Sequence, residues 1–375
     1  MALAAKSFNG NRAHSLGVEL ELQLVDSKSM ALKSGVTQIL EAMDEVDSEW
    51  IKPELMQCYM EINTGICHTV ADVRTDLAGK LRLLNDAAER LDTRLFWAGT
   101  HPFSPWYDQQ ITPNDRYFQL VEKMQDTARR LVTFGMHVHV GVDTGDKAIM
   151  LVDRLLRYIP PLLSLSANSP FWCGRNTGLH SYRSKIMETL PTAGLPPLMR
   201  NWSEYLWVVN HSVETGFINS IREIWWDIRP HPTFGTVEVR ICDMPPNLDD
   251  VIGITALIQC LVARLSEYID EGVYQHDAHP IMVQQNKWKA CRYGLTSTLV
   301  DPTTHQAIES RNLAENLVEF LLPTADKLQC RNELEWIGTM ATRPNGAERQ
   351  LEVYRKTQDM RAVVETMIEE NALLK

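Results

Sequence analysis

Side chains that can bind metals or phosphates alternate with apolar side chains in four short stretches of the sequence. The stretches span residues 17–26, 57–63, 135–141 and 235–243. Because successive side chains of a β-strand point to opposite faces, the polar members of each stretch share one face. We therefore predict that the four stretches are strands of one sheet, and that the polar face of this sheet carries groups that can bind metals or phosphates. That face would carry Glu19, Glu21, Glu61, His137, His139, Glu238 and Arg240.

Two carboxylates lie close together in the first stretch. On one face of a strand, Glu19 and Glu21 stand about 7 Å apart, since a strand rises about 3.3 Å per residue. Like charges at that distance repel unless a cation lies between them. Taken alone, the pair also fits a solvated strand face. Taken alone, His137 and His139 also allow two interpretations. They could be metal ligands or a half-buried, hydrogen-bonded pair.

The combination of these groups favours a metal site over several independent solvated faces. Five carboxylates and one imidazole form an oxygen-rich set, which suits Mg²⁺ or Mn²⁺ better than structural zinc. Cations of this kind commonly hold phosphates, and a neighbouring arginine such as Arg240 can neutralise a phosphoryl group in transfer. Arg229 and Arg292 are further candidates for that role. The predicted metal ligands are Glu19, Glu21, Glu54, Glu61, His137 and Glu238.

Glycine-rich phosphate loops do not explain how a nucleotide would bind. Residues 141–147 resemble a Walker A loop, but the spacing is one residue short and the terminal Ser or Thr is missing. The Gly-x-Gly-x-x-Gly pattern of dinucleotide-binding folds does not occur either. A phosphate-handling protein of this sequence would have to hold ATP through metals and arginines.

Several motifs resemble those of a known superfamily. Residues 135–139, Gly-Met-His-Val-His, resemble the Gly-x-His-x-His stretch of glutamine synthetases, and the Glu-x-Glu and Glu-x-Arg pairs occur in the same order. The seven-residue step from Glu54 to Glu61 is similar to the acidic pair of bacterial glutamate–cysteine ligases. The nearest resemblance is to the carboxylate–amine ligase group called YbdK-like, or glutamate–cysteine ligase type 2. Its signatures match residues 17–21, 99–103, 181–184, 226–230 and 292–295.

The resemblance implies a role for each matching side chain, with ATP and two or three Mg²⁺ or Mn²⁺ ions as cofactors. One metal would be held by Glu21, Glu54 and Glu61, and a second by Glu19, His137 and Glu238. His139 would lie against the phosphates or the adenine, and Arg240 would stabilise the γ-phosphoryl group. Arg183 and Arg229 would bind the substrate carboxylate, where a bidentate fork suits the group. Lys287 and Arg292 would contact the nucleotide.

The implied reaction is ATP-dependent amide formation through an acyl phosphate. The family label indicates weak glutamate–cysteine ligase activity, but no residue of the sequence identifies cysteine as the amine. A ligase with another amine acceptor is therefore a first alternative. A metal-dependent hydrolase is a second, although a hydrolase has less need of an arginine beside its metal ligands. A non-catalytic protein with solvated polar faces is a third.

The surrounding elements predict an α+β fold, which the resemblance specifies as a glutamine synthetase-like curved antiparallel sheet. Helices would cover one face of the sheet, and the metal and ATP site would lie on the other. Helical spacing predicts helices over residues 71–95, 115–134 and 202–214, and throughout the chain beyond residue 300. We expect residues 1–300 to form the catalytic domain and residues 301–375 a helical segment packed on it.

Composition and charge restrict the class of protein. The net charge is −11 and basic residues form no stripe, which argues against a nucleic-acid interface. Apolar runs stay below the ~20 residues of a membrane span, and the N-terminus lacks a signal-peptide core. The seven cysteines include no Cys-x-x-Cys pair and are expected to be free, packed thiols. We expect a cytoplasmic homodimer acting on small amino-acid substrates.

Overall fold

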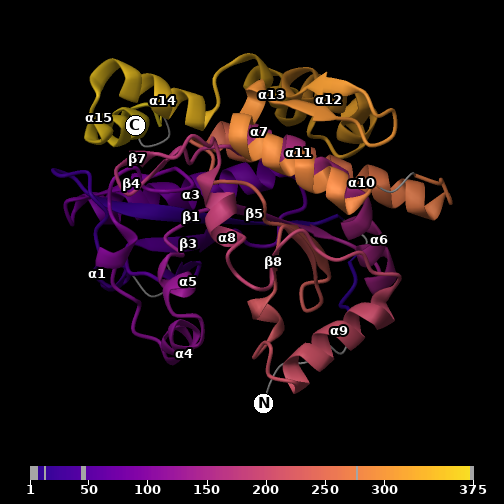
Figure 1. Cartoon of the computed structure of the whole chain (residues 1–375), viewed down its shortest axis with the longest axis horizontal. Coiled ribbons are helices and arrows are strands. Elements are labelled where there is room, and N and C mark those ends of the chain that lie inside the picture. The colour runs from indigo at the N-terminus through magenta and orange to yellow at the C-terminus, as the bar shows by residue number, and fades with distance from the viewer. Residues whose placement is uncertain (1–6, 12–13, 44–47, 276–277, 372–375) are drawn as a thin grey trace.

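A computed structural model of the chain describes residues 7–11, 14–43, 48–275 and 278–371. Its largest element is a seven-stranded sheet whose pairings are all antiparallel (Figure 1). The strands run in the order β10-β11-β5-β1-β3-β2, and β4 also pairs with β1. The bounds are β1 Leu16–Asp26, β2 Ile51–Pro53, β3 Tyr59–Asn63, β4 Thr93–Phe96, β5 Met136–Gly141, β10 Ile228–His231 and β11 Thr236–Val239.

The register of the sheet brings the predicted polar side chains together. Glu19 of β1 pairs with His137 of β5, and on its other side β1 pairs Glu21 with Glu61 of β3. Strand β11 pairs Glu238 with His139, which is also on β5. Residues directly opposite each other in an antiparallel pair project from the same face. Strands that are distant in the sequence therefore place their charged groups side by side.

The opposite face of the sheet is apolar and buried. The side chains of Val18, Leu20, Leu22 and Leu24 of β1 are all at most 1% exposed. Burying one such side chain stabilises the fold by roughly 1.5–3 kcal/mol. Helices α3 (Val70–Glu89), α6 (Gly145–Leu155) and α10 (Leu248–Asp270) contact strands of the sheet and contribute to the same core. The predicted α+β class, with an apolar face under helices, is confirmed.

Helices α12 and α13 lie over α10 and share its core, with Leu321, Leu334 and Ile337 fully buried (Figure 1). Figure 1 also shows α4 and α9 on the other side of the sheet. The remaining helices are α1 Val36–Ala42, α4 Asp115–Met124, α5 Asp126–Arg129, α7 Ile159–Ser166, α8 Tyr182–Met187, α9 Trp202–Glu214, α11 Pro280–Tyr293, α12 Ser310–Lys327, α13 Arg331–Thr342, α14 Gly346–Thr357 and α15 Met360–Glu369. Single turns of 3₁₀ helix are η1 Trp106–Asp108, η2 Leu156–Tyr158, η3 Ile221–Glu223 and η4 Gly294–Thr296.

Two expectations about elements were wrong. The helix expected over residues 115–134 is interrupted at Gln125, whose φ of 50° is incompatible with a continuous helix, and it ends at α5. The chain near residue 300 is not wholly helical, because β12 (Thr298–Val300) and β13 (Ala307–Glu309) form a hairpin. Glu54 lies outside the predicted stretch 57–63 and follows the end of β2.

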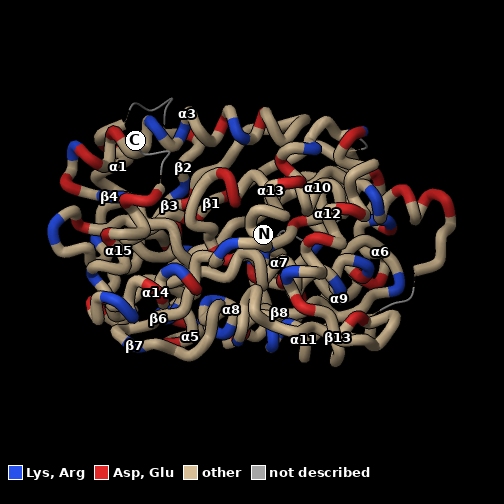
Figure 2. Tube along the Cα trace, turned by 90° about the horizontal axis from the view of Figure 1, so that it is seen from above, with Lys and Arg blue, Asp and Glu red and all other residues tan. Residues whose placement is uncertain are grey.

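Short strands complete the structure, and charges of both signs are interspersed along the chain (Figure 2). Strands β6 (Phe171–Trp172) and β7 (Arg175–Asn176) form an antiparallel pair, and β8 (Ala193–Gly194) and β9 (Trp225–Trp226) a parallel one. All seven cysteines are free, and all except Cys173 are buried, as predicted. Among the described helices, none is both long and apolar enough to cross a membrane.

Candidate functional site

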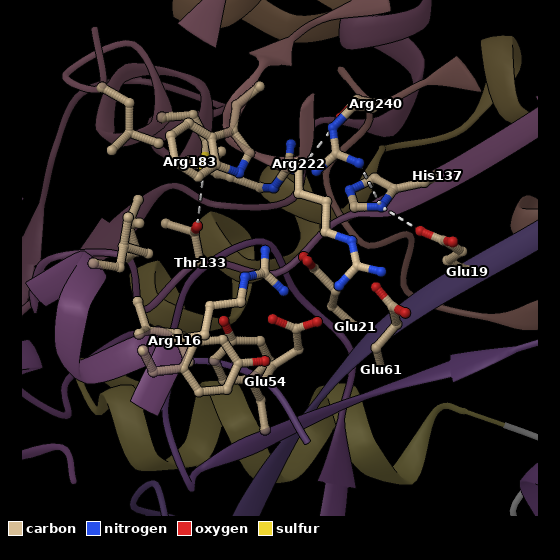
Figure 3. Close-up of a pocket in the computed structure, with 18 of the residues that line it drawn as sticks. Glu19, Glu21, Glu54, Glu61, Arg116, Thr133, His137, Arg183, Arg222 and Arg240 are labelled. Carbon is tan, nitrogen blue, oxygen red and sulfur yellow. Dashed lines mark hydrogen bonds and ion pairs between the residues drawn. The ribbon is translucent and has the colours of Figure 1, made fainter. Parts of the chain in front are cut away.

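A cavity lies over the polar face of the sheet, and most of the predicted metal ligands line it (Figure 3). Its walls come from β1 and β3, from the loop after β2, from α4, from α8 and from the segment around η3 and β9. Carboxylates and guanidinium groups therefore face each other across one space. The charged and imidazole groups that line it are Glu19, Glu21, Glu54, Glu61, His137, Arg116, Arg183, Arg222, Arg229 and Arg240.

Glu238 is fully buried and is held by two arginines. The Nε of Arg229 donates to its Oε2 at 2.7 Å, and the Nη1 of Arg240 donates to its Oε1. Burial alone would raise the pKa of this carboxyl, but the two guanidinium groups hold the pKa well below its usual range. Glu238 is therefore a buried, ionised carboxylate that positions Arg229 and Arg240, both of which line the cavity.

Glu19 lies between the two histidines of β5. Its Oε2 is 3.1 Å from Nδ1 of His137, and its Oε1 is 3.4 Å from Nε2 of His139. Burial opposes ionisation here too, yet hydrogen bonding and charge from the histidines hold the pKa of Glu19 well below its ordinary value. The Nδ1 of His139 bonds to the hydroxyl of Thr236 at 2.9 Å, which orients the ring. The buried Nε2 of His137 has no hydrogen-bond partner among the described residues, and the polar neighbours of the His139 Nε2 are the carboxylates of Glu19 and Glu238.

Two groups of potential ligand atoms fit a divalent cation. Glu19, His139 and Glu238 form one group and Glu19, Glu61 and His137 the other, with the atoms of each group within 4.8 Å of one another. A divalent cation would bind the buried imidazole nitrogens together with the neighbouring carboxylates and would offset the negative charge that these carboxylates share. The resemblance implied different sets, with His137 beside Glu238 and His139 on the phosphates. The structure instead places His139 beside Glu238.

Glu21 and Glu54 lie in the cavity but outside both groups. A carboxylate oxygen of Glu21 accepts a hydrogen bond from the backbone N–H of Gly135. Burial raises the pKa of Glu54 well above its ordinary value, and the nearby charges of Glu61 and Glu21 raise it further. Burial, followed by the charge of Glu19, also raises the pKa of Glu61 to about 7. These carboxylates are close enough to repel one another, which again favours a cation between them.

Arg183 enters the cavity from α8 and is 4% exposed. Its Nη1 and Nη2 donate to the backbone carbonyls of Ile241 and Arg240, at 3.3 and 3.4 Å, and its buried Nε has no partner among the described residues. The base of α8 is held by Asp243, which accepts hydrogen bonds from the hydroxyls of Ser169 and Ser181. The position of Arg183 is consistent with its predicted contact to a substrate.

Two of the predicted contacts lie elsewhere. The side chain of Lys287 is 2% exposed, and its Nζ pairs with Asp227 at 2.5 Å and Glu188 at 2.7 Å, so it is part of a buried ion cluster. The guanidinium of Arg292 lies 4.7 Å from the ring centre of Tyr293. Neither residue lines this cavity. The predicted nucleotide contact by Lys287 stays a prediction, and in this structure its ammonium group is paired with two carboxylates of the fold.

Sequence reasoning missed several lining residues. Arg116 and Tyr117 come from the first turn of α4, Arg222 from η3 and Thr133 from the loop before β5. They occur in helices and loops, where no alternation marks the face that they share. Only the register and packing of the tertiary structure bring them to the site.

A second, more apolar pocket lies beyond Glu19 and His139. It is bordered by the start of β1, the loop after β3 and the turn between β10 and β11. Glu19 lines both pockets, so the ligand groups stand between them. The second pocket is lined by Asn11, Ser15, Leu16, Gly17, Val18, Glu19, Lys52, Asn63, Thr64, Gly65, Ile66, His139, Thr233, Phe234 and Thr236.

Comparison with known proteins identifies the family. Residues 15–370 match the glutamate-cysteine ligase family 2 (GCS2). The chain belongs to this family. A protein of Gloeobacter violaceus named "Putative glutamate--cysteine ligase 2" is 43% identical over 359 residues, which are 95% of this chain and 96% of the relative. A protein of the same name from Thermobifida fusca is 40% identical over 367 residues, 97% of this chain and 92% of the relative.

Solved structures support the fold. A glutamate–cysteine ligase of Francisella tularensis, crystallised with AMP, superposes with a TM-score of 0.69 at 12% identity, covering 99% of this chain and 92% of that one. A bifunctional glutathione synthetase of Pasteurella multocida gives 0.67 at 14% identity, covering 95% of this chain and 52% of that one. The glutamine synthetase-like fold implied by the motifs is confirmed.

Proposed function

We propose that the protein is an ATP-dependent carboxylate–amine ligase that activates the γ-carboxylate of L-glutamate, with L-cysteine as the acceptor that the family name suggests. The observation that carries the proposal is the position of Glu19, which lines both pockets and shares a potential cation site with His139 and the buried Glu238. A cluster suited to a phosphate-binding cation thus separates a more apolar pocket from an arginine-rich one. Family membership supports the same assignment.

The nucleotide would occupy the more apolar pocket, with its phosphates directed toward Glu19 and His139. Exposed Ile66 and Phe234 offer apolar contacts at the rim of that pocket. The donor amino acid would occupy the arginine-rich cavity, where the unpartnered Nε of Arg183 is available for a carboxylate. Arg240 lines the same cavity and would stabilise the phosphoryl group.

The reaction follows from this arrangement in two steps. A γ-carboxylate oxygen of the donor attacks the γ-phosphorus of ATP, the bond to the β,γ-bridging oxygen breaks, and ADP leaves. The amine nitrogen then bonds to the acyl carbon, the carbon–oxygen bond to phosphate breaks, and the nitrogen loses a proton. The protein contributes orientation, positive charge and exclusion of water from the acyl phosphate.

The ligand groups support Mg²⁺ or Mn²⁺ as the resident cations. Glu19, His139 and Glu238 would hold one ion and Glu19, Glu61 and His137 another, with Glu21 and Glu54 close by. Bound cations of this kind neutralise phosphate charge during transfer.

We also propose a cytoplasmic homodimer in which residues 1–300 are the catalytic part and residues 301–375 a helical part packed on it. The shared core of α10, α12 and α13 supports one compact unit. The exposed side chains of Trp207 and Tyr274, at 61% and 82%, offer apolar surface for an interface.

The test is ADP release with Mg²⁺, L-glutamate and an amine, each omitted in turn. A ligase requires all three, whereas a hydrolase turns over without the amine. Glu238→Gln and Arg240→Ala are each expected to lower kcat/KM at least 100-fold, because charge stabilisation of the phosphoryl group is lost. Glu319→Gln, an exposed carboxylate of α12, is the matched control. Cooperative unfolding of each variant is checked first, because Glu238→Gln leaves two arginines without their anion.

The proposal would be contradicted if the rate of ADP release did not depend on glutamate, or if Glu238→Gln and Arg240→Ala both kept full activity.

A further inference from the structure

The arginine-rich cavity has a neighbouring pocket on its α4 and η3 side. The two pockets share Arg116, Leu120, Arg222 and Trp225, so they are direct neighbours at these residues. Neither Glu19 nor His139 lines this neighbouring pocket, whereas both line the proposed nucleotide pocket. We call it the α4 pocket. It is lined by Arg116, Gln119, Leu120, Asn219, Ser220, Arg222, Glu223 and Trp225.

Two arginines at this junction differ from the others in the cavity. Arg229 and Arg240 are paired with Glu238, and Arg183 donates to backbone carbonyls. The guanidinium groups of Arg116 and Arg222 make no hydrogen bond or ion pair with any residue that the structure describes. Figure 3 shows both side chains directed into the cavity.

The same two arginines act on one neighbouring phenol. Burial raises the pKa of Tyr117, the charge of Glu54 raises it further, and the charges of Arg116 and Arg222 oppose the rise. Both positive charges are therefore close to Tyr117, although one comes from α4 and the other from η3. Arg116 also lies 5.8 Å from the ring centre of Tyr117. Two guanidinium groups that converge from separate elements and have no carboxylate partner are suited to an anionic group of a ligand.

The position of the α4 pocket indicates which ligand that is. The proposed reaction places the nucleotide beyond Glu19 and the activated donor carboxylate beside Arg240. An amine that attacks the acyl carbon must approach from a side that the phosphate does not fill. The α4 pocket meets the cavity away from the nucleotide pocket, and Leu120 and Trp225 add apolar contact area there.

We propose that the α4 pocket is the acceptor subsite and that Arg116 and Arg222 bind a carboxylate of the acceptor. This inference depends on the proposed ligase function. It makes the acceptor an amino acid or a peptide that carries a carboxylate and an uncharged side chain, rather than a simple amine. During attack, the new C–N bond forms as the C–O bond to phosphate breaks, and the carboxylate stays on the arginines.

Matched acceptor pairs test this subsite. ADP release is measured with L-cysteine against cysteamine and with L-alanine against ethylamine, and with hydroxylamine as an acceptor without carbon. The wild type is expected to prefer the carboxylated member of each pair by about 10–100-fold in kcat/KM, as for a charge-assisted contact. Arg116→Gln and Arg222→Gln should each reduce that ratio toward one. Because the ratio is taken within one variant, a general loss of activity divides out.

A matched control is Arg82→Gln, an exposed arginine of α3, which should keep the wild-type ratio. Equal use of both members of each pair by the wild type would overturn the inference. So would an unchanged ratio in both variants together with a raised KM for glutamate in the hydroxylamine reaction, which would place the arginines on the donor. Absence of any hydroxamate from the wild type would contradict the ligase proposal itself, and this inference with it.

Discussion

The imidazole of His101 is fully buried in a fixed tautomer. Its Nε2–H donates to the carbonyl of Met30 at 3.0 Å, and its Nδ1 accepts from the backbone N–H of Ser104 at 3.0 Å. Burial lowers the pKa of this group to about 3. A proton on Nδ1 would also face the backbone N–H of Ser104, so the folded protein holds His101 neutral.

The stability of the protein should therefore depend on pH through His101. The folded pKa of about 3 lies below an unfolded value of about 6.5, so the unfolded state binds more protons between those values. The contribution is complete above about pH 6.5 and is lost as the pH falls toward 3. From pH 7 to pH 5 the expected loss is about 2 kcal/mol. Urea unfolding of the wild type and His101→Asn at both pH values measures it.

The variant should be less stable at pH 7 but lose less between the two pH values. His305→Asn, at an exposed position with φ 59°, is the control and should follow the wild type. An equal loss in His101→Asn and the wild type would contradict this assignment.

For single residues, the sequence predicts the position of site residues well when they lie in strands and poorly when they lie in helices or loops. Glu19, His137 and Glu238 were predicted to share a face because side chains alternate along a strand, and the structure places them on it. Arg116 has no such periodicity. The resemblance placed Lys287 at the nucleotide. Its ion pairs could not be predicted, because Asp227 and Glu188 lie 60 and 99 positions away in the sequence.

Helix α11 is tied to two other parts of the chain by Lys287. Its ammonium group is enclosed between Asp227, which follows β9, and Glu188, which follows α8. Burial alone would lower the pKa of Lys287, but the two carboxylates raise it above its ordinary value. The cluster thus fixes the segments that carry Arg183 and Arg229 without entering the cavity.

Lys287→Met should destabilise the protein by roughly 3–5 kcal/mol, because it leaves Asp227 and Glu188 without their cation. Lys289→Met, two residues further along the same helix, is the matched control and should change the free energy of unfolding by less than about 0.5 kcal/mol. Chemical denaturation at pH 7 measures both. Equal stability of the two variants would show that the cluster does not hold these elements together.

Elements with strong periodicity are also the ones that the sequence predicts best. The helix predicted over residues 202–214 is α9 without any change of bounds. The interruption at Gln125 was missed because glutamine, unlike glycine, does not mark a positive φ. The hairpin of β12 and β13 was missed because three-residue strands are too short to show an alternation.

For the whole molecule, the order of strands in the sheet determines which side chains meet at the candidate site. Strand β1 lies between β5 and β3, and β5 lies next to β11, so groups more than 200 residues apart in sequence meet at Glu19. The alternation of each strand indicates its polar face, but it does not indicate which strands are neighbours or in what register. The motif resemblance predicted a curved antiparallel sheet. Only the three-dimensional structure shows that a pocket lies on each side of Glu19.

The most direct test of the account is the fate of oxygen from the donor carboxylate. The protein is incubated with ATP, Mg²⁺, hydroxylamine and L-glutamate labelled with ¹⁸O in its γ-carboxylate, and the released phosphate is analysed by mass spectrometry. The account predicts one ¹⁸O atom in each phosphate, because the carboxylate oxygen that attacks phosphorus leaves with it. Phosphate without the label, or an absence of phosphate release, would contradict an acyl-phosphate ligase.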